Sequence, residues 1–232
     1  MRRRLLYTAC CASGLFWEAS WNTELPVDRA ALLAQVNYCP TALLPDTWTD
    51  SLGVNEDRPM TCLTWYEAFA FCIWDGGYLP TQAEWNYTAA GGDQQRAYPW
   101  STPSQSLIID GSYASYSTGT VNSPNCIGDG LPGCAVTDLV PVGTKPLGDG
   151  RWGHSDLAGN VSEWLLDWWG YPATCIDCAN LIVPVFDPER LARGGNIMSL
   201  GDGTFGVRIA SDSGLDFPSN VGLTGVRCAR AP

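Results

Sequence analysis

Ten cysteines and a single histidine, His154, are the residues of this 232-residue chain best suited to redox or metal chemistry. Only Cys175 and Cys178 form a close C-x-x-C pair, and one histidine is too few for a zinc site of mixed Cys and His ligands. The C-x-x-C pair would be redox-active in a thioredoxin-like setting, but no such strand and helix surround it, so we expect a small structural disulfide. Scattered, even-numbered cysteines are typical of disulfide-bonded proteins in oxidising, extracytoplasmic compartments.

The chain is acidic, with a formal net charge of -11 from 24 acidic and 13 basic residues. This charge argues against a nucleic-acid partner, because no basic surface would offset the phosphates, and it is compatible with a bound divalent cation. No apolar run is long enough to span a membrane. The start, Met1–Arg4 followed by a short apolar stretch and Cys10-Cys11, resembles a very short signal or lipoprotein segment; the alternative is an internal methionine. We therefore expect a secreted or lipid-anchored monomer.

The elements that must position any site begin with two short helices, each opened by a capping box. In such a box a threonine accepts the backbone N–H of the third helical residue, and a glutamate reaches back to the threonine. The boxes, and the glycine pairs that should end their helices, are Thr64–Glu67 with Gly76–Gly77 and Thr81–Glu84 with Gly91–Gly92. A further helix is predicted over 26–38, with Asp28 as its cap.

After residue 95 the helix signals stop, and short apolar stretches alternate with glycine, serine, aspartate and proline. Residues 157–170, 190–209 and 224–229 have strand-like patterns. Residues 101–150 form a long irregular segment, and such loops are uncommon unless they are functional or tied down, here by Cys126 and Cys134. The pattern predicts one α+β domain with little regular secondary structure and long, disulfide-pinned loops.

Several segments, in the same order along the chain, resemble the sequence motifs of one family. They are PMTCLTWYEA at 59–68, LPTQAEWNY at 79–87, YPW at 98–100, DLAGNVSEW at 156–164, RGG at 193–195 and GVRC at 225–228. They are similar to P-V-x-x-V-S-W-x-D-A, L-P-T-E-A-E-W-E-Y, Y/F-P-W, D-M-x-G-N-V-W-E-W, R-G-G-S and G-F-R-C of the formylglycine-generating enzyme, or sulfatase-modifying factor, family. One such motif would be weak evidence, whereas the ordered set is specific.

The resemblance implies a variant of the C-type-lectin-like fold, which agrees with the α+β pattern above. It covers residues 58–232, which we expect to form the sulfatase-modifying-factor-like domain. Residues 1–57 match poorly and lack the family's usual opening strand, which a truncated start would explain.

The resemblance also implies an oxidase, because catalytic relatives bind copper with a pair of cysteines after R-G-G-S and oxidise a substrate cysteine to formylglycine. In this chain those positions hold Ser199 and Thr204, and Asn196 stands where the family has its serine. Hydroxyls are hard, poor ligands for Cu(I) and form no disulfides, so we expect neither copper nor the standard oxidase activity. Arg208 begins a segment similar to the family's R-V-A, which argues against a slipped alignment.

Two other metals occur in the family. Some relatives hold iron with three histidines, which His154 alone cannot supply. The family's G-N-x-W-E motif lines a calcium site, and Asn160 and Glu163 keep its side-chain positions, with the backbone of Gly159 and Val161 between them. Oxygen ligands suit Ca²⁺, so we expect a structural calcium ion there. The alternative is a structural turn whose polar groups bond to the backbone.

Disulfide pairing follows partly from the resemblance and partly from proximity. The resemblance implies a bridge between Cys72 and Cys228. Proximity in the sequence suggests the bridges Cys39–Cys62, Cys126–Cys134 and Cys175–Cys178. Cys10 and Cys11 stay unassigned, with lipidation, pairing between molecules and an artefact of the start site all open.

The sequence leaves open whether the protein is an enzyme. We favour a non-catalytic family member, an extracytoplasmic binding or structural module whose ligand surface includes Asn196, Ser199, Thr204 and Arg208. Its partner would be a protein, a peptide or a small ligand. The alternative is a metal-dependent oxidoreductase that acts on protein or peptide cysteine through other ligands, such as the C-x-x-C pair. A third reading is an accessory subunit that binds sulfatase-like peptides without oxidising them.

Overall fold

The computed structural model describes residues 17–39, 47–170, 179–186, 188–201, 206–215 and 222–230. Its regular elements are, in chain order, η1 (Ala19–Glu24), α2 (Arg29–Val36), α3 (Trp65–Trp74), α4 (Gln82–Ala89), η2 (Gly92–Gln94), η3 (Val136–Asp138), η4 (Pro146–Gly148), β1 (Ser162–Trp168), β2 (Arg190–Arg193), β3 (Asp212–Leu215) and β4 (Thr224–Gly225), where η is a 3₁₀-helix. Turns and loops make up most of the remaining described chain. The predicted α+β class with little regular secondary structure is therefore confirmed.

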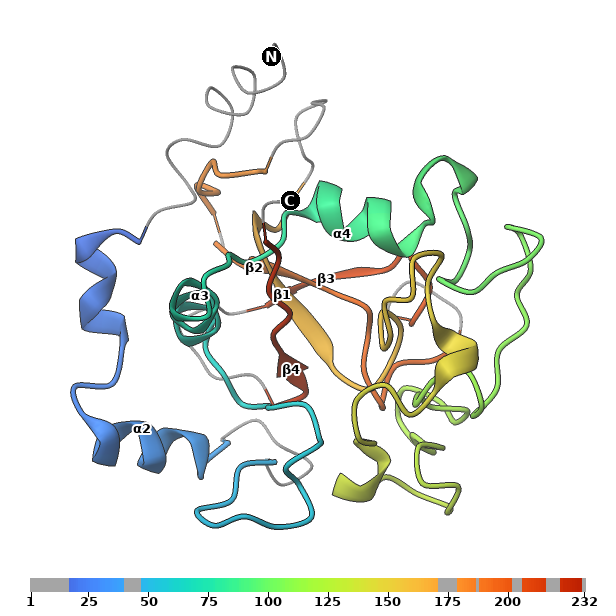
Figure 1. The fold of residues 1–232 in the computed structure, drawn as a ribbon, viewed down its shortest axis with the longest axis horizontal. Helices are drawn as coiled ribbons and strands as arrows, with labels where there is room; N and C mark the ends of the chain where they lie inside the picture. The colour runs from blue at the N-terminus through green and yellow to red at the C-terminus, as the bar shows by residue number, and fades with distance from the viewer. Residues whose placement is uncertain are drawn as a thin grey trace.

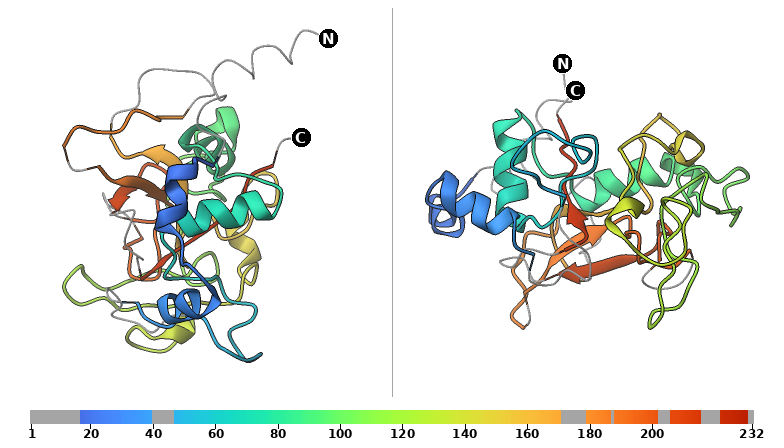
Figure 2. Two further views of the ribbon diagram at one scale, coloured as in Figure 1. Left: turned by 90° about the vertical axis from the view of Figure 1, so that its left-hand side faces the viewer. Right: turned by 90° about the horizontal axis from the view of Figure 1, so that it is seen from below.

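The strands form one mixed sheet in the order β3-β2-β1-β4. Strand β1 pairs antiparallel with β2 and parallel with β4, and β2 pairs antiparallel with β3. In Figure 1 the sheet lies at the centre, with α2 and α3 on one side and the irregular segment 101–150, green to yellow, on the other. The view from below in Figure 2 shows the same division. No helix within the described residues has the length and apolarity to cross a bilayer.

Local capping sets the ends of α3 and α4 as the sequence predicts. Thr64 and Glu67 form a reciprocal capping box at the start of α3, and Thr81 and Glu84 form another at the start of α4. Gly76 follows α3 with a φ of 78°, a left-handed conformation that costs glycine little. Because these signals act within one helical turn, the sequence reveals them without any knowledge of the tertiary structure.

The segment before residue 58 shares the core of the rest of the chain. Helix α2 begins after Asp28, whose carboxylate accepts the N–H of Ala31, so the helix predicted over 26–38 is confirmed in a shorter form. Trp21 of η1 packs edge-on against Trp65 of α3, with their ring centroids 5.4 Å apart.

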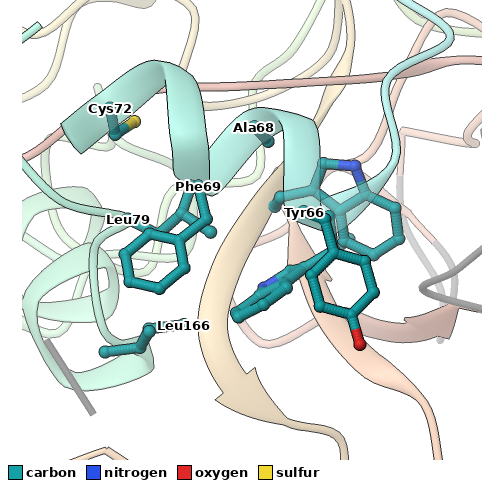
Figure 3. Packing of buried hydrophobic residues seen from close by; sticks show 9 residues of the cluster. Tyr66, Ala68, Phe69, Cys72, Leu79 and Leu166 are labelled. Atoms are coloured by element: carbon teal, nitrogen blue, oxygen red, sulfur yellow. The ribbon is translucent and has the colours of Figure 1, made fainter. Parts of the chain in front are cut away.

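The main hydrophobic core lies between α3 and β1 (Figure 3). Trp65 and Phe69 of α3 pack there with Trp164 and Leu166 of β1, and all of them are buried. Each buried indole also has a hydrogen-bond acceptor. Trp65 Nε1 donates to the carbonyl of Leu165 at 2.7 Å, and Trp164 Nε1 donates to the carbonyl of Leu63, just before α3, at 3.0 Å. Burial of such large rings, with their N–H groups paired, fixes α3 on the sheet.

The buried Arg190 side chain contacts this core through Trp65. The Arg190 guanidinium is stacked between the rings of Trp65 and Trp168, 3.7 Å from each centroid. Its Nη1 donates to the carbonyl of Leu166 at 2.6 Å. Burial lowers the pKa of Arg190 to about 9, and the nearby Asp167 carboxylate opposes that shift. Arg190 of β2 thus contacts Trp65 of α3 with one face of its guanidinium and Trp168 of β1 with the other, and its hydrogen bond to Leu166 adds a second contact to β1.

Asp167 lies beside Arg190 and fixes two other segments. Its carboxylate accepts the backbone N–H of Gln82 at 2.7 Å and of Asn180 at 2.6 Å. Burial raises the pKa of Asp167 above its ordinary 3.8, although both N–H groups and the Arg190 charge pull the pKa down. Desolvation of the carboxylate therefore outweighs the stabilisation that its hydrogen bonds and Arg190 provide.

Disulfides join the pairs Cys39–Cys62, Cys72–Cys228 and Cys126–Cys134. All of these pairs were predicted; the first and last from proximity and the long-range Cys72–Cys228 bridge from the family resemblance. The predicted Cys175–Cys178 pair lies outside the described residues. The bridges that are described indicate an oxidising compartment.

Candidate functional site

Strand β2 ends at two glycines that redirect the chain. Gly194 and Gly195 have φ values of 90° and 65°, in the left-handed region that side chains other than glycine rarely adopt. A Cβ on Gly195 would lie 3.0 Å from the Ser199 hydroxyl. The strand predicted over 190–209 is therefore short, and the following residues form a turn instead.

We call Asn196–Ser199 the site turn. The Ser199 hydroxyl accepts the Asn196 N–H at 3.0 Å, and the Ser199 N–H donates to the Asn196 carbonyl at 2.9 Å. The Asn196 side chain accepts the N–H of Met198 at 3.0 Å and donates to the Ser162 hydroxyl of β1 at 3.2 Å. Two of the predicted surface residues, Asn196 and Ser199, thus lie together and hold the turn closed.

Arg208 lies on the segment that runs beside the end of the site turn. Leu200 forms a parallel bridge with Gly206, and its carbonyl accepts the N–H of Val207 at 3.0 Å. The Arg208 side chain is half-buried, and its Nε is buried without a hydrogen-bond partner among the residues that the structure describes. Thr204, the remaining predicted surface residue, lies outside the described residues.

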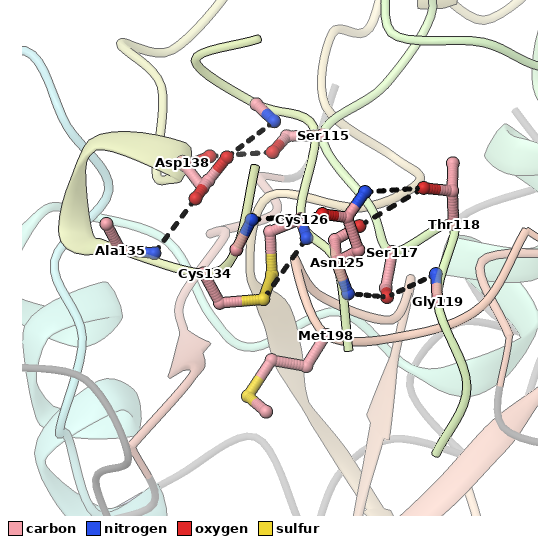
Figure 4. The surroundings of a disulfide bond; sticks show 12 residues. Ser115, Ser117, Thr118, Gly119, Asn125, Cys126, Cys134, Ala135, Asp138 and Met198 are labelled. Carbon is pink, nitrogen blue, oxygen red and sulfur yellow. Dashed lines mark hydrogen bonds between the residues drawn. A yellow bond between two sulfur atoms is a disulfide. The ribbon is translucent and has the colours of Figure 1, made fainter. Parts of the chain in front are cut away.

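The long segment 101–150 is fastened to the site turn through Ser117. Its N–H donates to the Ser199 carbonyl at 2.8 Å, and it forms backbone bridges with both Leu200 and Cys126. Figure 4 shows the Cys126–Cys134 disulfide in this region, with Met198 beside it. The sequence predicts that this disulfide pins the loop, but gives no signal that the loop lies against the site turn.

The predicted metal residues line a separate cavity of about 360 Å³. Asn160 and Glu163 lie in its wall together with Asp156 and Arg227. Asn160 has a φ of 63°, which interrupts the strand predicted over 157–170, and its Nδ2 donates to the carbonyl of Val140 at 3.1 Å. Its Oδ1 is buried and has no hydrogen-bond partner within the described part of the chain.

Glu163 is held by an arginine and a tryptophan. Its carboxylate accepts Nη2 of Arg227 at 2.7 Å, Nε of Arg227 at 3.0 and 3.1 Å, and Nε1 of Trp85 at 2.9 Å. The Glu163 charge raises the pKa of Arg227, which also donates to the Ser155 carbonyl at 2.8 Å. Asp156, in the same cavity, has its pKa raised by burial. The cavity therefore holds two carboxylates and one guanidinium.

These residues fit calcium by the chemistry of their donors. Asn160 Oδ1 is a buried oxygen that lacks a donor, and the carboxylates of Asp156 and Glu163 line the same cavity. Among the described residues, no group of three or more His, Cys, Asp or Glu side chains could hold a metal, so an ion would also draw on amide and backbone oxygens. It would compete with Arg227 for Glu163.

Sequence reasoning missed Asp156, Arg227 and Trp85 as members of this site. All of them belong to motifs that the sequence analysis noted, within 156–164, 225–228 and 79–87. The signal was therefore present, but the partners of Glu163 are distant in sequence, and only the fold brings them together. His154, the single histidine, is exposed.

Comparison with known proteins agrees with the motifs. A family model described as sulfatase-modifying factor enzyme 1-like domain matches residues 32–232. The chain is 31% identical to the formylglycine-generating enzyme of Mus musculus over 185 residues, which cover 80% of this chain and 47% of the relative. It is 28% identical over 184 residues to the inactive C-alpha-formylglycine-generating enzyme 2 of Mus musculus. That match covers 76% of this chain and 51% of the relative. The chain thus spans about half the length of these curated relatives.

Among solved structures, the Treponema denticola variable protein 1 has a similar fold. The TM-score is 0.54 at 19% sequence identity, and the match covers 88% of this chain and 81% of that one. At this identity the likeness concerns the fold alone.

Proposed function

Because the chain belongs to the sulfatase-modifying factor family, we propose that it is a binding module of that fold which does not convert cysteine to formylglycine. Ser199 carries this proposal. Its hydroxyl stands where the resemblance places a catalytic thiol, and it accepts the Asn196 N–H inside the site turn. We place the protein outside the cytoplasm, secreted or lipid-anchored, in keeping with its disulfides.

The loss of oxidase activity follows from ligand chemistry. Cu(I) prefers soft thiolate ligands, and thiolates can also exchange with a substrate cysteine. Ser199 and Thr204 offer only hard, protonated hydroxyls, which do neither. We therefore expect no copper at these positions.

The ligand surface would centre on the site turn and Arg208, with Thr204 included. The Arg208 side chain is half-buried, and a guanidinium suits a carboxylate, which it binds through charge-assisted hydrogen bonds. A protein or peptide with an acidic group is therefore the ligand class that these residues favour, and we expect the protein to bind it as a monomer.

A turnover assay tests the proposal. The purified chain, loaded with copper and calcium, is incubated in air with a C-x-P-x-R peptide, and the products are read by mass spectrometry. We expect the peptide to keep its cysteine. Formation of formylglycine would overturn the proposal and would favour the oxidoreductase alternative, with catalytic ligands elsewhere in the chain, such as Cys175 and Cys178.

Binding is measured separately, with an acidic peptide and two arginine variants. Arg208→Ala should weaken binding by roughly 10- to 100-fold, the loss expected for a charge-assisted hydrogen bond. Arg230→Ala is the matched control, because Arg230 is exposed and paired with Asp75. Equal effects of the two substitutions would contradict a ligand surface at Arg208.

We also propose that calcium binds in the Asn160–Glu163 cavity in a structural role. The buried, unpartnered Asn160 Oδ1 supports this. Calcium should raise the free energy of unfolding by about 2.7 kcal/mol when its concentration is about 100 times its Kd. Asn160→Ala should abolish that gain, whereas Asn37→Ala, at an exposed position, should keep it. Identical thermal unfolding in calcium and in a chelator would contradict the proposal.

A further inference from the structure

The segment 181–186, which we call the apolar tip, presents apolar side chains to solvent. Ile182, Val183, Val185 and Phe186 are 78%, 57%, 88% and 88% exposed, respectively. The sequence of the tip, LIVPVF, contains no charged or hydrogen-bonding side chain. In Figure 2 the segment, drawn in orange, reaches the edge of the molecule in both views. Single exposed apolar residues are ordinary, but such a concentration of them marks an interaction surface.

Both ends of the apolar tip are fixed to the end of β1. At the first end, the Asn180 carbonyl accepts the Trp168 N–H at 2.8 Å, and the Asn180 side-chain amide donates to the Trp168 carbonyl at 3.1 Å. At the second end, the Glu189 carbonyl accepts the N–H of Trp169 at 2.8 Å. Leu181 is half-buried and packs against the main core. The fold thus holds the rest of the tip outward on a fixed stem.

The exposed apolar side chains of the tip point in more than one direction. Ile182 and Val183 are neighbours in the chain, and so are Val185 and Phe186. Neighbouring side chains diverge by about 100° in a helix and by about 180° in a strand, so neither pair lies on a single face. A flat protein surface would therefore cover one member of each pair and leave the other in water. Surroundings that are apolar on all sides fit the tip better, as they do for a helix that is apolar all round.

A tryptophan lies at the base of the tip. Trp169 is 44% exposed, and its ring packs against the backbone of Gly214 in β3, where an added Cβ would lie 2.7 Å from the ring. The same Cβ would also meet the Glu189 carboxylate. Tryptophan is enriched where the apolar interior of a membrane meets water, because its ring is apolar and its N–H is polar. From the tip to the stem, the side chains thus change from apolar to tryptophan to carboxylate, as the environment does across a lipid interface.

Entry of the tip into a lipid interface would desolvate no charged group. The tip itself has none, and the first charged residue after it is Asp187. Pro184 has no N–H, so one of the backbone donors that lipid cannot satisfy is missing. Segments that lie in the interface enter by only about 5–10 Å, a depth at which the other backbone groups stay close to water and to lipid headgroups.

We infer that the apolar tip inserts into the interface of a lipid bilayer, so that the protein binds membrane surfaces made of zwitterionic lipid. Apolar contact drives this binding. The net charge of -11 opposes attraction to anionic lipid, and Arg190, the one basic residue in 179–190, is buried.

Membrane binding goes beyond the proposed function and does not depend on it. The tip precedes β2 and the site turn follows it, so the two lie at opposite ends of that strand. Insertion of the tip would therefore leave the site turn outside the lipid, where it could bind a ligand. Each of the two functions can fail without the other.

Co-sedimentation of the full chain with phosphatidylcholine vesicles tests the inference. The wild type should bind, and Phe186→Asp should lower the partition coefficient by at least about tenfold, because burial of one phenylalanine side chain already contributes that much. Val121→Asp is the matched control, since Val121 is 78% exposed but stands between Thr120 and Asn122, and it should bind like the wild type. Both positions are exposed, so the two variants should unfold at the temperature of the wild type. A wild type that binds no vesicles, or equal losses in the two variants, would overturn the inference.

Two further measurements distinguish apolar insertion from other modes of binding. Phe186→Leu should bind vesicles within about threefold of the wild type, because lipid accepts any apolar side chain. Raising the salt concentration from about 0.1 M to about 0.5 M should change binding by less than about twofold, and anionic lipid should not strengthen it. Binding that needs anionic lipid and is lost in salt would be electrostatic and would contradict the inference. A wild type that ignores vesicles but self-associates in sedimentation velocity, with Phe186→Asp monomeric, would assign the tip to a contact between copies instead.

Discussion

The pairing of Glu163 with Arg227 gives the sharpest test of how the candidate metal cavity is built. The Glu163 side chain is 5% exposed and that of Arg227 is 30% exposed. Replacing Glu163 by glutamine keeps the size of the side chain and one acceptor oxygen, but removes the charge that faces the guanidinium. The effect on stability therefore measures the ion pair more than the packing.

The magnitude follows from partial burial. Breaking a buried ion pair by removing one partner costs about 3–5 kcal/mol, because a charge is left unpaired. Here Arg227 keeps its bond to the Ser155 carbonyl and some contact with water, and glutamine can still accept from Trp85. We therefore expect Glu163→Gln to lower the free energy of unfolding by about 2–3 kcal/mol, or the melting temperature by about 4–12 °C.

Equilibrium urea unfolding in a chelator measures this loss without any contribution from calcium. Asp93→Asn is the matched control, since Asp93 pairs with Arg151 at 3.1 Å but is 93% exposed, and it should change stability by less than about 0.5 kcal/mol. A double-mutant cycle with Arg227→Met should give a coupling above about 1 kcal/mol. A Glu163→Gln variant as stable as the wild type, with no coupling, would refute the reasoning.

Two further predictions concern the buried charges of the main core. For Asp167, burial raises the pKa above 3.8, so the folded state binds its proton more tightly than the unfolded chain does, and stability falls as pH rises through the window just above 3.8. In urea unfolding, the stability advantage of the wild type over Asp167→Asn should therefore shrink as the pH is raised above 3.8, and an advantage that grows would contradict this. For Arg190, the ammonium of a lysine cannot stack flat between the two indoles as the guanidinium does. Arg190→Lys should therefore lower the free energy of unfolding by about 2–4 kcal/mol. A loss below about 1 kcal/mol would show that the stacking contributes little to stability.

The features that the sequence predicts correctly are local. The capping boxes of α3 and α4 and the cap Asp28 each act within four residues, so composition and spacing suffice to find them. The disulfides Cys39–Cys62 and Cys126–Cys134 are short-range as well. The long-range Cys72–Cys228 bridge was available only through the family resemblance.

The features that sequence reasoning missed depend on backbone conformations and distant pairs. Positive φ at Gly194 and Gly195 ends β2, and positive φ at Asn160 delays β1, which the hydrophobic pattern alone cannot show. Strand β3 was not predicted at all, because its four residues carry no clear alternation. The partners of Glu163 come from elements 78 and 64 residues away.

The site turn shows how the fold accommodates a serine at position 199. Ser199 is fixed mainly through its backbone, whose carbonyl accepts the Ser117 N–H and whose N–H donates to Asn196. Ile197 is bound to the Asn160 carbonyl at 3.2 Å, again through the backbone. None of these bonds depends on a thiol, and the serine hydroxyl adds one of its own by accepting the Asn196 N–H. A serine at this position therefore fits the turn through its backbone bonds and adds a hydroxyl acceptor, so the stability of the turn does not depend on a thiol there.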